Sequence, residues 1–282
     1  MTMASNSTDP AEAVERKASG SSFYSAMRLM PKAERRAMFA IYAFCRMVDD
    51  IADEGIGTRE ERQRELAAWR ADLDALYANG QPERSAFLAD SVQRYGLRKE
   101  DFLAVIDGME MDVAEDIKGP NLEMLDLYCE RVASAVGRLS VKVFGMEENS
   151  GFELAHHLGR ALQLTNILRD LDEDAEMGRL YLPPEFLVHA GVAYDDPSTA
   201  IASPAIDPVC RNVAALAHEH YARAESIMGS RPRGRIRTPR LMGAVYREIL
   251  RRMEAVGWAP PRTRVSVPKA QLLLIVLRNG LR

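Results

Sequence analysis

The chain has 282 residues, of which 47% are hydrophobic, and its formal net charge is −4 at pH 7. This length allows one large domain or two small ones, and the apolar content suffices for a sizeable core. The slightly acidic balance argues against a protein that neutralises the phosphates of nucleic acid, so no nucleic-acid partner is expected.

The first residues are polar and of mixed charge, and we expect residues 1–18 to form a flexible tail. They contain no apolar stretch of the kind found in a signal peptide. The three cysteines lack metal-ligand spacing and are too few for a disulfide framework. The most apolar late run, residues 272–277, is far shorter than the roughly 20 residues that span a bilayer. These features predict a cytoplasmic protein.

A hydrophobic repeat of about 3.6 residues dominates the chain, with little strict alternation. Its first segment, residues 32–53, has a wide apolar face and is followed by Glu-Gly-Ile-Gly, where a helix would end. No parallel-sheet pattern, repeat of fixed period or Gly/Ser-rich linker is present, so we predict one all-α domain over residues 19–282. Further helices are predicted over residues 58–78, 82–95, 99–116, 121–144, 151–176, 204–228, 239–256 and 268–277, with a loop or short extended piece over 178–185.

Aspartates gather at the end of the first of these helices. Asp49 and Asp53 are four residues apart, which places their Cβ atoms on one helix face about 6 Å apart. Asp170 and Asp174 repeat this spacing near the end of another apolar helix. Because the C-terminal end of a helix is unfavourable for negative charge, two such pairs indicate a compensating cation.

A hard divalent cation explains these pairs. Mg²⁺ prefers oxygen ligands and often shares its coordination shell with substrate phosphates. Two facing pairs would hold metal ions on both sides of a diphosphate. One pair alone is more often a solvated helix edge, and neither motif matches an EF-hand loop. The pairs are accompanied by two arginines, which can bind phosphate oxygens in a fork, and by two amides: Arg46, Arg169, Gln163 and Asn166.

Several stretches resemble the squalene/phytoene synthase family, whose members condense two prenyl diphosphates head to head. The most specific is the second aspartate motif, QLTNILRDLDEDAEMGRLYLP, at residues 163–183. GMEMDVAEDI, at residues 108–117, is most similar to the bacterial branch that makes presqualene diphosphate for hopanoid synthesis. The other similar stretches are SSFYSAMRLMP (21–31), IYAFCRMVDDIAD (41–53) and YCERVASAVG (128–137), so the resemblance covers most of the chain.

The resemblance implies the isoprenoid-synthase fold, with helices around a central cavity. It implies Mg²⁺, with Mn²⁺ as an alternative, bound by Asp49, Asp53, Asp170 and Asp174, with Asn166 beside the second pair. It also implies a set of phosphate-binding and pocket-lining residues. The phosphate contacts would be Arg46, Arg169, Tyr246 and Arg264, and the substrate pocket would include Ser22, Phe23, Tyr42, Tyr128 and Gln163.

In the implied reaction an allylic diphosphate leaves, and metal ions and arginines stabilise its negative charge. The double bond of a second farnesyl diphosphate attacks the resulting cation, and proton loss closes the cyclopropane of presqualene diphosphate. Apolar walls exclude water, and the rings of Tyr42 and Tyr128 could stabilise the cation. Tyr42 is also the candidate to accept or relay the proton.

The sequence motifs barely separate this activity from that of phytoene, dehydrosqualene or hydroxysqualene synthase. A non-catalytic helical assembly factor with the same fold is a different class, against which the intact motifs argue. No Gly-x-Gly-x-x-Gly follows a strand, so no NADPH is expected, and a downstream squalene-forming enzyme would consume the product. The dense arginines of residues 231–264 raise the alternative of peripheral contact with the anionic inner membrane. The five histidines show no zinc-like spacing, and we assign them no chemistry.

Overall fold

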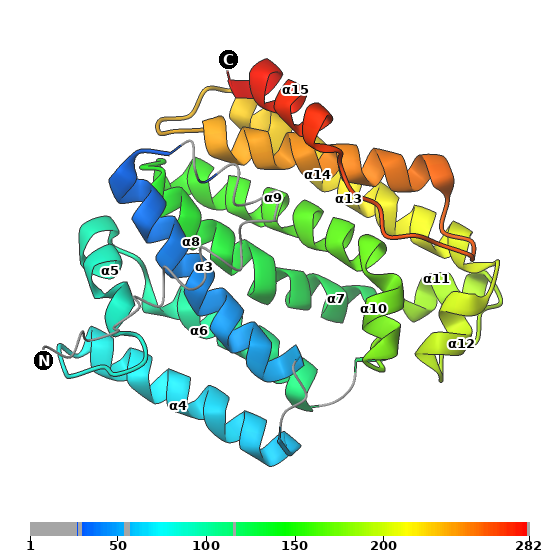
Figure 1. Cartoon of the computed structure of the whole chain (residues 1–282), viewed down its shortest axis with the longest axis horizontal. Helices are drawn as coiled ribbons and strands as arrows, with labels where there is room; N and C mark the ends of the chain where they lie inside the picture. Colours follow the sequence, from blue (N-terminus) through cyan, green and yellow to red (C-terminus); the bar gives the residue numbers. More distant parts are fainter. Residues whose placement is uncertain (1–26, 28–29, 54–56, 115–116, 281–282) are drawn as a thin grey trace, which may run out of the picture.

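The computed structural model describes residues 27, 30–53, 57–114 and 117–280 (Figure 1). The tail predicted over residues 1–18 lies outside these ranges, as do the predicted pocket residues Ser22 and Phe23. Within the described ranges the chain forms no strand, and its one β-type contact is an isolated parallel bridge between Lys118 and Leu180. The prediction of an all-α fold is therefore confirmed.

The helices fall into three groups along the chain. The first group is α3 (Lys32–Asp53), α4 (Arg59–Tyr77), the 3₁₀ turn η1 (Ala86–Leu88), α5 (Ala89–Tyr95) and α6 (Lys99–Ala114). The middle group is α7 (Leu122–Cys129), the π-helical turn η2 (Glu130–Ser134), α8 (Ala135–Val143), α9 (Glu148–Arg169) and α10 (Leu171–Glu176). The last group is α11 (Pro184–His189), α12 (Pro197–Ala202), α13 (Ile206–Gly229), α14 (Arg237–Val256) and α15 (Lys269–Gly280).

Two long predicted helices are interrupted in the structure. The helix predicted over residues 121–144 contains the π-helical turn η2, which divides it into α7 and α8. The helix predicted over residues 151–176 breaks at Asp170, whose backbone angles (φ −104°, ψ 17°) end α9 before α10 begins. Both breaks fall inside continuous apolar patterns. Neither position has a glycine or proline, so the sequence pattern does not predict the break.

Three further differences concern short elements. The segment predicted as one helix over residues 82–95 forms η1 and α5 instead. Neither α11 nor α12 is predicted, because each has only six residues, too few to show a helical period. Each begins at a proline, Pro184 or Pro197, which suits the first turn of a helix and which a sequence pattern takes as a boundary.

The arrangement in Figure 1 places α8 and α9 through the middle of the molecule. Helices α3, α4 and α6 lie on one side of them, and α13, α14 and α15 lie on the other. Helix α9 contacts α8, α13 and α14, while α3 contacts α6 and α8. Helices α8 and α9 therefore pack between the two outer groups of helices and contact both of them.

Apolar spacing and small residues bring these helices together. The buried stripe of α3 includes Phe44, whose ring meets those of Trp69 and Phe102 edge to face at centroid distances of 5.5 and 5.0 Å. Glycine permits the close crossing of α9 with the preceding segment. A Cβ atom at Gly159 would lie 2.8 Å from the backbone of Ser134, closer than packed atoms approach. The position of α9, which carries the second acidic motif at its end, thus depends on this glycine.

Candidate active site

The last turns of α3 carry the first acidic motif. The Arg46 guanidinium donates through Nη1 to Asp49 Oδ2 at 2.9 Å and pairs through Nε with Asp50 Oδ1 at 2.8 Å. Burial, together with the nearby carboxylate of Asp53, raises the pKa of Asp49 to about 7. Arg46 lowers that pKa but does not offset the other effects.

The second motif occupies the junction between α9 and α10. Arg169 holds Asp170 through two hydrogen bonds, at 2.8 and 2.6 Å, and Arg264 donates to the same carboxylate at 2.8 Å. Asp174 lies one turn later, in the first turn of α10. The prediction that this pair lies at a helix C-terminus is therefore wrong for Asp174, because the chain starts a new helix after Asp170 and places Asp174 at the end that favours negative charge.

Asp174 differs from its neighbours in forming no ion pair with a described cation, although the positive charge of Arg179 lies close enough to lower its pKa. No described residue forms a hydrogen bond or ion pair with its side chain. Burial and then the Asp170 carboxylate raise the pKa of Asp174 to about 8, and Asp53 and Asp112 add to this effect. Since Asp53 belongs to the other motif, the two motifs lie within electrostatic range of one another.

Two residues that we did not predict, Arg179 and Asp112, lie next to the motif carboxylates. Arg179 follows α10 and donates to Asp53 Oδ1 at 2.5 Å and to the Ala52 carbonyl at 2.9 Å. Asp112, on α6, is buried, and burial raises its pKa to about 6. The hydroxyl groups of Tyr181 and Tyr128 donate to its two oxygens at 2.7 and 3.1 Å, and their rings stack.

The sequence does hold a signal for Asp112. Asp112 and Asp116 have the four-residue spacing of the two predicted motifs, although Asp116 lies outside the described residues. Arg179 and Tyr181 fall inside the stretch of residues 163–183 on which the family resemblance depends. Their partners are far away in the chain, so local spacing does not identify their roles.

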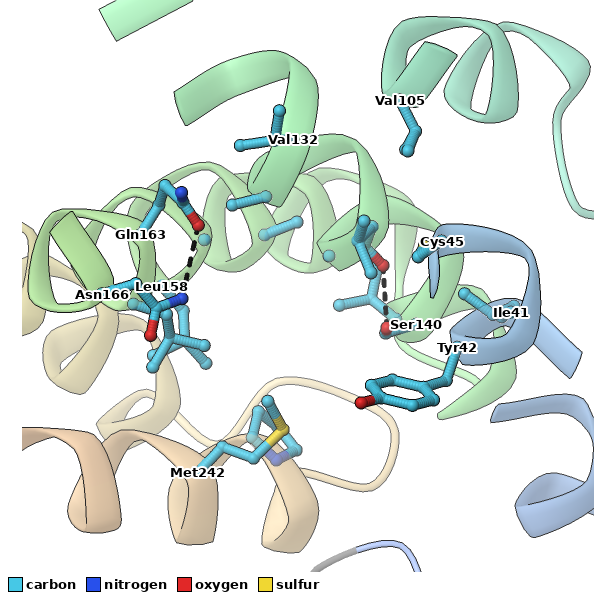
Figure 2. Close-up of a pocket in the computed structure, with 18 of the residues that line it drawn as sticks. Ile41, Tyr42, Cys45, Val105, Val132, Ser140, Leu158, Gln163, Asn166 and Met242 are labelled. Atoms are coloured by element: carbon cyan, nitrogen blue, oxygen red, sulfur yellow. Dashed lines mark hydrogen bonds between the residues drawn. The ribbon is translucent and has the colours of Figure 1, made fainter. Parts of the chain in front are cut away.

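A cavity of about 330 Å³ opens between α3, α6, α8, α9 and α14 (Figure 2). Its polar lining comes mainly from the last turns of α3 and α9, and earlier turns contribute apolar side chains. Figure 2 shows the Tyr42 ring directed into the space, with Gln163 and Asn166 at the opposite side. Burial raises the pKa of Tyr42, so its phenol is neutral at pH 7. The predicted residues that line this cavity are Tyr42, Arg46, Asp49, Tyr128, Gln163, Asn166 and Tyr246.

Other predicted residues lie beside the cavity lining. Asp53 lies close to the lining residue Asp49 and pairs with Arg179, while Arg169 and Arg264 both bind Asp170. Arg169 and Arg264 also line an adjacent hollow of about 320 Å³. The structure thus brings together the predicted site residues that it describes, from α3, the junction of α9 with α10, α14 and the segment before α15.

The oxygen donors of this site fit a divalent hard cation. Asn166 Oδ1 is buried and has no hydrogen-bond partner, which is unfavourable unless a ligand supplies one. The raised pKa values of Asp49 and Asp174 reflect, after burial, the repulsion of neighbouring carboxylates, which a cation would relieve. Carboxylate and amide oxygens are the donors that Mg²⁺ takes.

Comparison with known proteins agrees with this arrangement. A family model described as squalene/phytoene synthase matches residues 16–271. This chain belongs to the squalene/phytoene synthase family. The predicted family resemblance is therefore confirmed. The chain is a prenyltransferase of this family.

Relatives within the family match over most of their length. A presqualene diphosphate synthase of Zymomonas mobilis is 56% identical over 261 residues, covering 93% of this chain and 89% of that protein. One of Rhodopseudomonas palustris is 52% identical over 262 residues, covering 93% of this chain and 94% of that protein. The crystal structure of a dehydrosqualene synthase in complex with ligand has a TM-score of 0.82 and 24% identity, covering 96% of this chain and 95% of that one, and shows the shared fold.

Two observations bear on membrane contact by this squalene/phytoene synthase family member. Among the residues that the structure describes, no helix has both the length and the apolar character needed to cross a membrane. Several arginines of residues 231–264 form ion pairs, including Arg235 with Glu34 and Arg247 with Glu225. Part of the positive charge in this stretch is therefore neutralised by neighbouring carboxylates.

Proposed function

We propose that the protein condenses two molecules of farnesyl diphosphate to presqualene diphosphate and releases one diphosphate. The observation that supports this most directly is the closeness of the two carboxylate motifs beside an apolar cavity whose polar lining includes Arg46, Asp49 and Asn166. Identity above 50% to proteins named presqualene diphosphate synthase favours this reaction over that of phytoene, dehydrosqualene or hydroxysqualene synthase. Residues 19–282 would act as one catalytic domain.

We also propose that Mg²⁺, or Mn²⁺ in its place, is held by the four motif aspartates with Asn166 as a neutral ligand. When bound, the ion would stabilise the negative charge that develops on the departing diphosphate. The arginines Arg46, Arg169 and Arg264, with the Tyr246 hydroxyl, would bind the diphosphate oxygens and orient the carbon–oxygen bond that breaks. Arg46 is 43% exposed in its side chain and can reach a substrate entering the cavity.

The remaining lining residues protect and direct the cation. Apolar side chains such as Leu158 and Met242 exclude water, which would otherwise convert the cation to an alcohol. Tyr128 contributes its ring to the lining while its hydroxyl is committed to Asp112. Because the Tyr42 phenol is neutral, it serves as a proton relay, taking a proton from the cation as it gives its own to a diphosphate oxygen.

The product keeps one diphosphate, so a squalene-forming enzyme would act after this one. We propose that the reaction uses no NADPH and that the protein works in the cytoplasm. We also propose that it contacts the inner membrane peripherally, because its hydrophobic substrate and product partition there. Co-sedimentation with anionic lipid vesicles tests the last point. A protein that stays in the supernatant at low and at physiological salt would contradict membrane contact.

Product analysis tests the reaction. Purified protein is supplied with farnesyl or geranylgeranyl diphosphate, with Mg²⁺, and with or without NADPH, and the products are identified by mass spectrometry. We expect presqualene diphosphate from the farnesyl substrate, no squalene on adding NADPH, and no turnover after chelation. Squalene, phytoene or an alcohol as the main product would refute the proposed reaction.

Single variants test the metal ligands. Asp53→Asn and Asp174→Asn should each lower turnover by at least about 100-fold, because they weaken electrostatic stabilisation of the leaving group. Asp90→Asn, on the exposed face of α5, is the matched control and should keep wild-type turnover. Undiminished turnover in Asp174→Asn would remove the proposed metal site.

A further inference from the structure

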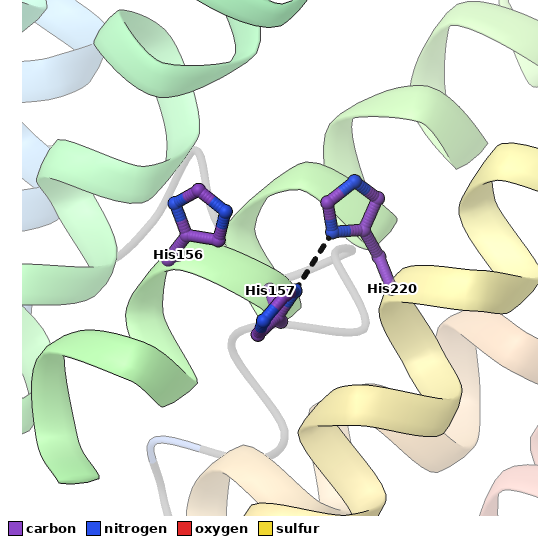
Figure 3. A group of neighbouring side chains, drawn as sticks. All are labelled: His156, His157 and His220. Carbon is purple, nitrogen blue, oxygen red and sulfur yellow. Dashed lines mark hydrogen bonds between the residues drawn. The ribbon is translucent and has the colours of Figure 1, made fainter.

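Three histidines meet on the outside of the bundle, although their sequence positions show no ligand spacing. Helix α9 carries His156 and His157, and α13 carries His220 (Figure 3). One ligand nitrogen from each ring lies within 4.8 Å of those of the other two. Figure 3 shows the rings converging, with a hydrogen bond of 3.0 Å between Nδ1 of His157 and Nδ1 of His220.

This group is separate from the proposed diphosphate site. The cavity-lining residues of α9 include Leu158, Leu162 and Asn166, which share one face at helical spacing. At 100° per residue, His157 lies on the opposite side of the helix from this face, and His156 lies beyond its edge, next to the position of Gln163. None of the three histidines lines the cavity.

The chemistry of the group suits a transition-metal ion. Imidazole nitrogen is a ligand for Zn²⁺, Cu²⁺ and Ni²⁺, and three such ligands leave one position of a tetrahedral zinc ion for water. At a zinc–nitrogen distance of about 2.0–2.1 Å, the ligand nitrogens of a tetrahedral site lie roughly 3.4 Å apart. The observed separations are of this order, so changes in side-chain torsion can bring the rings to a common ion. His156 is exposed and the other two rings are half-buried, which leaves solvent access.

Electrostatics also favour a metal over protons. Burial lowers the pKa of each ring, and with the proximity of His157 it lowers that of His220 to about 4. The rings are therefore neutral at pH 7, so a metal does not compete with an added proton. The hydrogen shared by Nδ1 of His157 and Nδ1 of His220 moves to Nε2 of its own ring when that Nδ1 coordinates the ion. Among the neighbouring cations, Arg160 is neutralised by Asp126, with hydrogen bonds of 2.6 and 2.9 Å, and by Glu130 at 2.7 Å. Arg138 also pairs with Glu130, and Arg223 is a further positive charge close to His157.

We propose that His156, His157 and His220 bind a divalent transition-metal ion of the zinc class, which links α9 to α13. The bound ion would fasten the helix that carries Asn166 to the helix packed behind it. It is distinct from the Mg²⁺ proposed at the carboxylates in its ligand type, its position and its preferred metal.

Zinc titration of the full-length, untagged and chelator-treated protein tests the site. Excess Mg²⁺ is kept present to occupy the carboxylates, and Zn²⁺ binding is followed by calorimetry. Co²⁺ serves as a spectroscopic probe, because imidazole ligation in a tetrahedral site produces visible absorption bands. We expect one equivalent of Zn²⁺ bound by the wild-type protein, and the Co²⁺ bands of a nitrogen-ligated ion.

Variants assign the binding to these rings. His220→Ala should weaken Zn²⁺ binding by at least about 100-fold. Removing a residue that only orients a ligand can already lower metal affinity by about 100-fold, and removing the ligand itself should lower it at least as much. His157→Gln is a second variant in case His220→Ala does not fold, and circular dichroism checks both. His218→Ala is the matched control, because His218 lies two residues away on α13 and pairs with Glu254 instead; its binding should match the wild type.

Two results would overturn the proposal. One is a wild-type protein that gives no binding heat and no Co²⁺ bands. The other is Zn²⁺ binding that survives in folded His157→Gln or His220→Ala but is lost in Asp53→Asn, which would place the ion at the carboxylates. Because the readout is binding, failure here leaves the proposed condensation reaction standing, and failure of that reaction leaves this site standing.

Discussion

The four motif aspartates have unequal neighbours, and this difference assigns them different tasks. Asp170 is held by two arginines, so its charge is largely compensated by the protein. Asp174 has no such partner among the described residues, and its pKa is raised. Asp53 is compensated by Arg179. A cation entering the site therefore gains most from Asp174 and Asp49, whose ionised forms the protein alone does not fully stabilise.

Arg179 follows the second motif in the chain and binds the first motif through Asp53 and the Ala52 carbonyl. Arg179→Gln should lower turnover by about 100-fold, because it leaves Asp53 without its cation and removes positive charge from the leaving-group end of the cavity. Steady-state kinetics at saturating Mg²⁺ measure this. Arg62→Gln is the matched control, since Arg62 donates to the same Ala52 carbonyl, at 3.1 Å, without pairing to Asp53. Equal losses in both variants would show that Arg179 acts only by supporting the end of α3.

The sequence brings forward candidate residues where they share a local spacing. Asp49, Asp53, Asp170 and Asp174 are candidates because their four-residue spacing is visible in the sequence, and their role in binding a metal stays a prediction. The pairing of Arg179 with Asp53 joins residues 126 positions apart, and no local pattern encodes such a contact. The convergence of the three histidines from two helices escapes prediction for the same reason.

At the scale of elements, periodicity predicts the long helices and fails at their interruptions. The bounds of α3 agree with the predicted helix over residues 32–53, because its apolar stripe is continuous and its end is marked by glycine. The π-helical turn η2 and the break at Asp170 depend on how neighbouring helices pack, which the sequence pattern does not contain. π-helical turns are frequent at functional sites, and here the separate break at Asp170 positions the second motif.

The crossing of α9 over the segment before α8 depends on Gly159. Gly159→Ala should destabilise the protein by about 1–3 kcal/mol, because the added methyl would meet the backbone of Ser134 at 2.8 Å. Denaturant unfolding measures this free energy. Gly229→Ala is the control: it lies at the end of α13 with no atom within 4 Å of the added Cβ, and should be neutral or slightly stabilising. An unchanged midpoint in Gly159→Ala would mean that the two segments can separate freely.

Glu248 joins α14 to α15 and makes this contact dependent on pH. Hydrogen bonds from Arg251 and Arg252 lower the pKa of Glu248 to about 2, and Gln271 of α15 donates to the same carboxylate at 2.6 Å. A lowered folded-state pKa means that the ionised form stabilises the fold. This contribution is complete above the unfolded pKa near 4.5 and is lost as the pH falls towards 2.

Glu248→Gln should therefore lower the unfolding free energy by about 1 kcal/mol at pH 7, and the difference from wild type should shrink as the pH falls below about 4.5. Denaturant unfolding between pH 7 and pH 3 follows this difference. Glu225→Gln, which removes an exposed pair with Arg247 alone, should show little effect at any of these values. A Glu248 difference that stays constant with pH would contradict the ionised contact.

At the scale of the whole molecule, the helices that carry the acidic motifs also define the depth of the cavity. The lining residues of α9 run from Asn166 back to Leu154, and the twelve helical steps between them span roughly 18 Å at 1.5 Å per residue. Because α8 leads into α9 through a short connection, Phe144 at the end of α8 lies near the start of α9, at the end of the cavity away from Asn166. A prenyl chain bound by its diphosphate would extend towards this ring.

The Phe144 ring should therefore limit the length of the prenyl chain that the cavity accepts. Phe144→Leu removes ring volume from the apolar end and should raise the rate with geranylgeranyl diphosphate relative to farnesyl diphosphate by about tenfold. Competition assays with both substrates measure the ratio directly. Phe102→Leu is the control, because Phe102 is equally buried and packs against Phe44 without lining the cavity. An equal shift in both variants would mean that general loosening of the core, and not the depth of the cavity at Phe144, sets the preference for chain length.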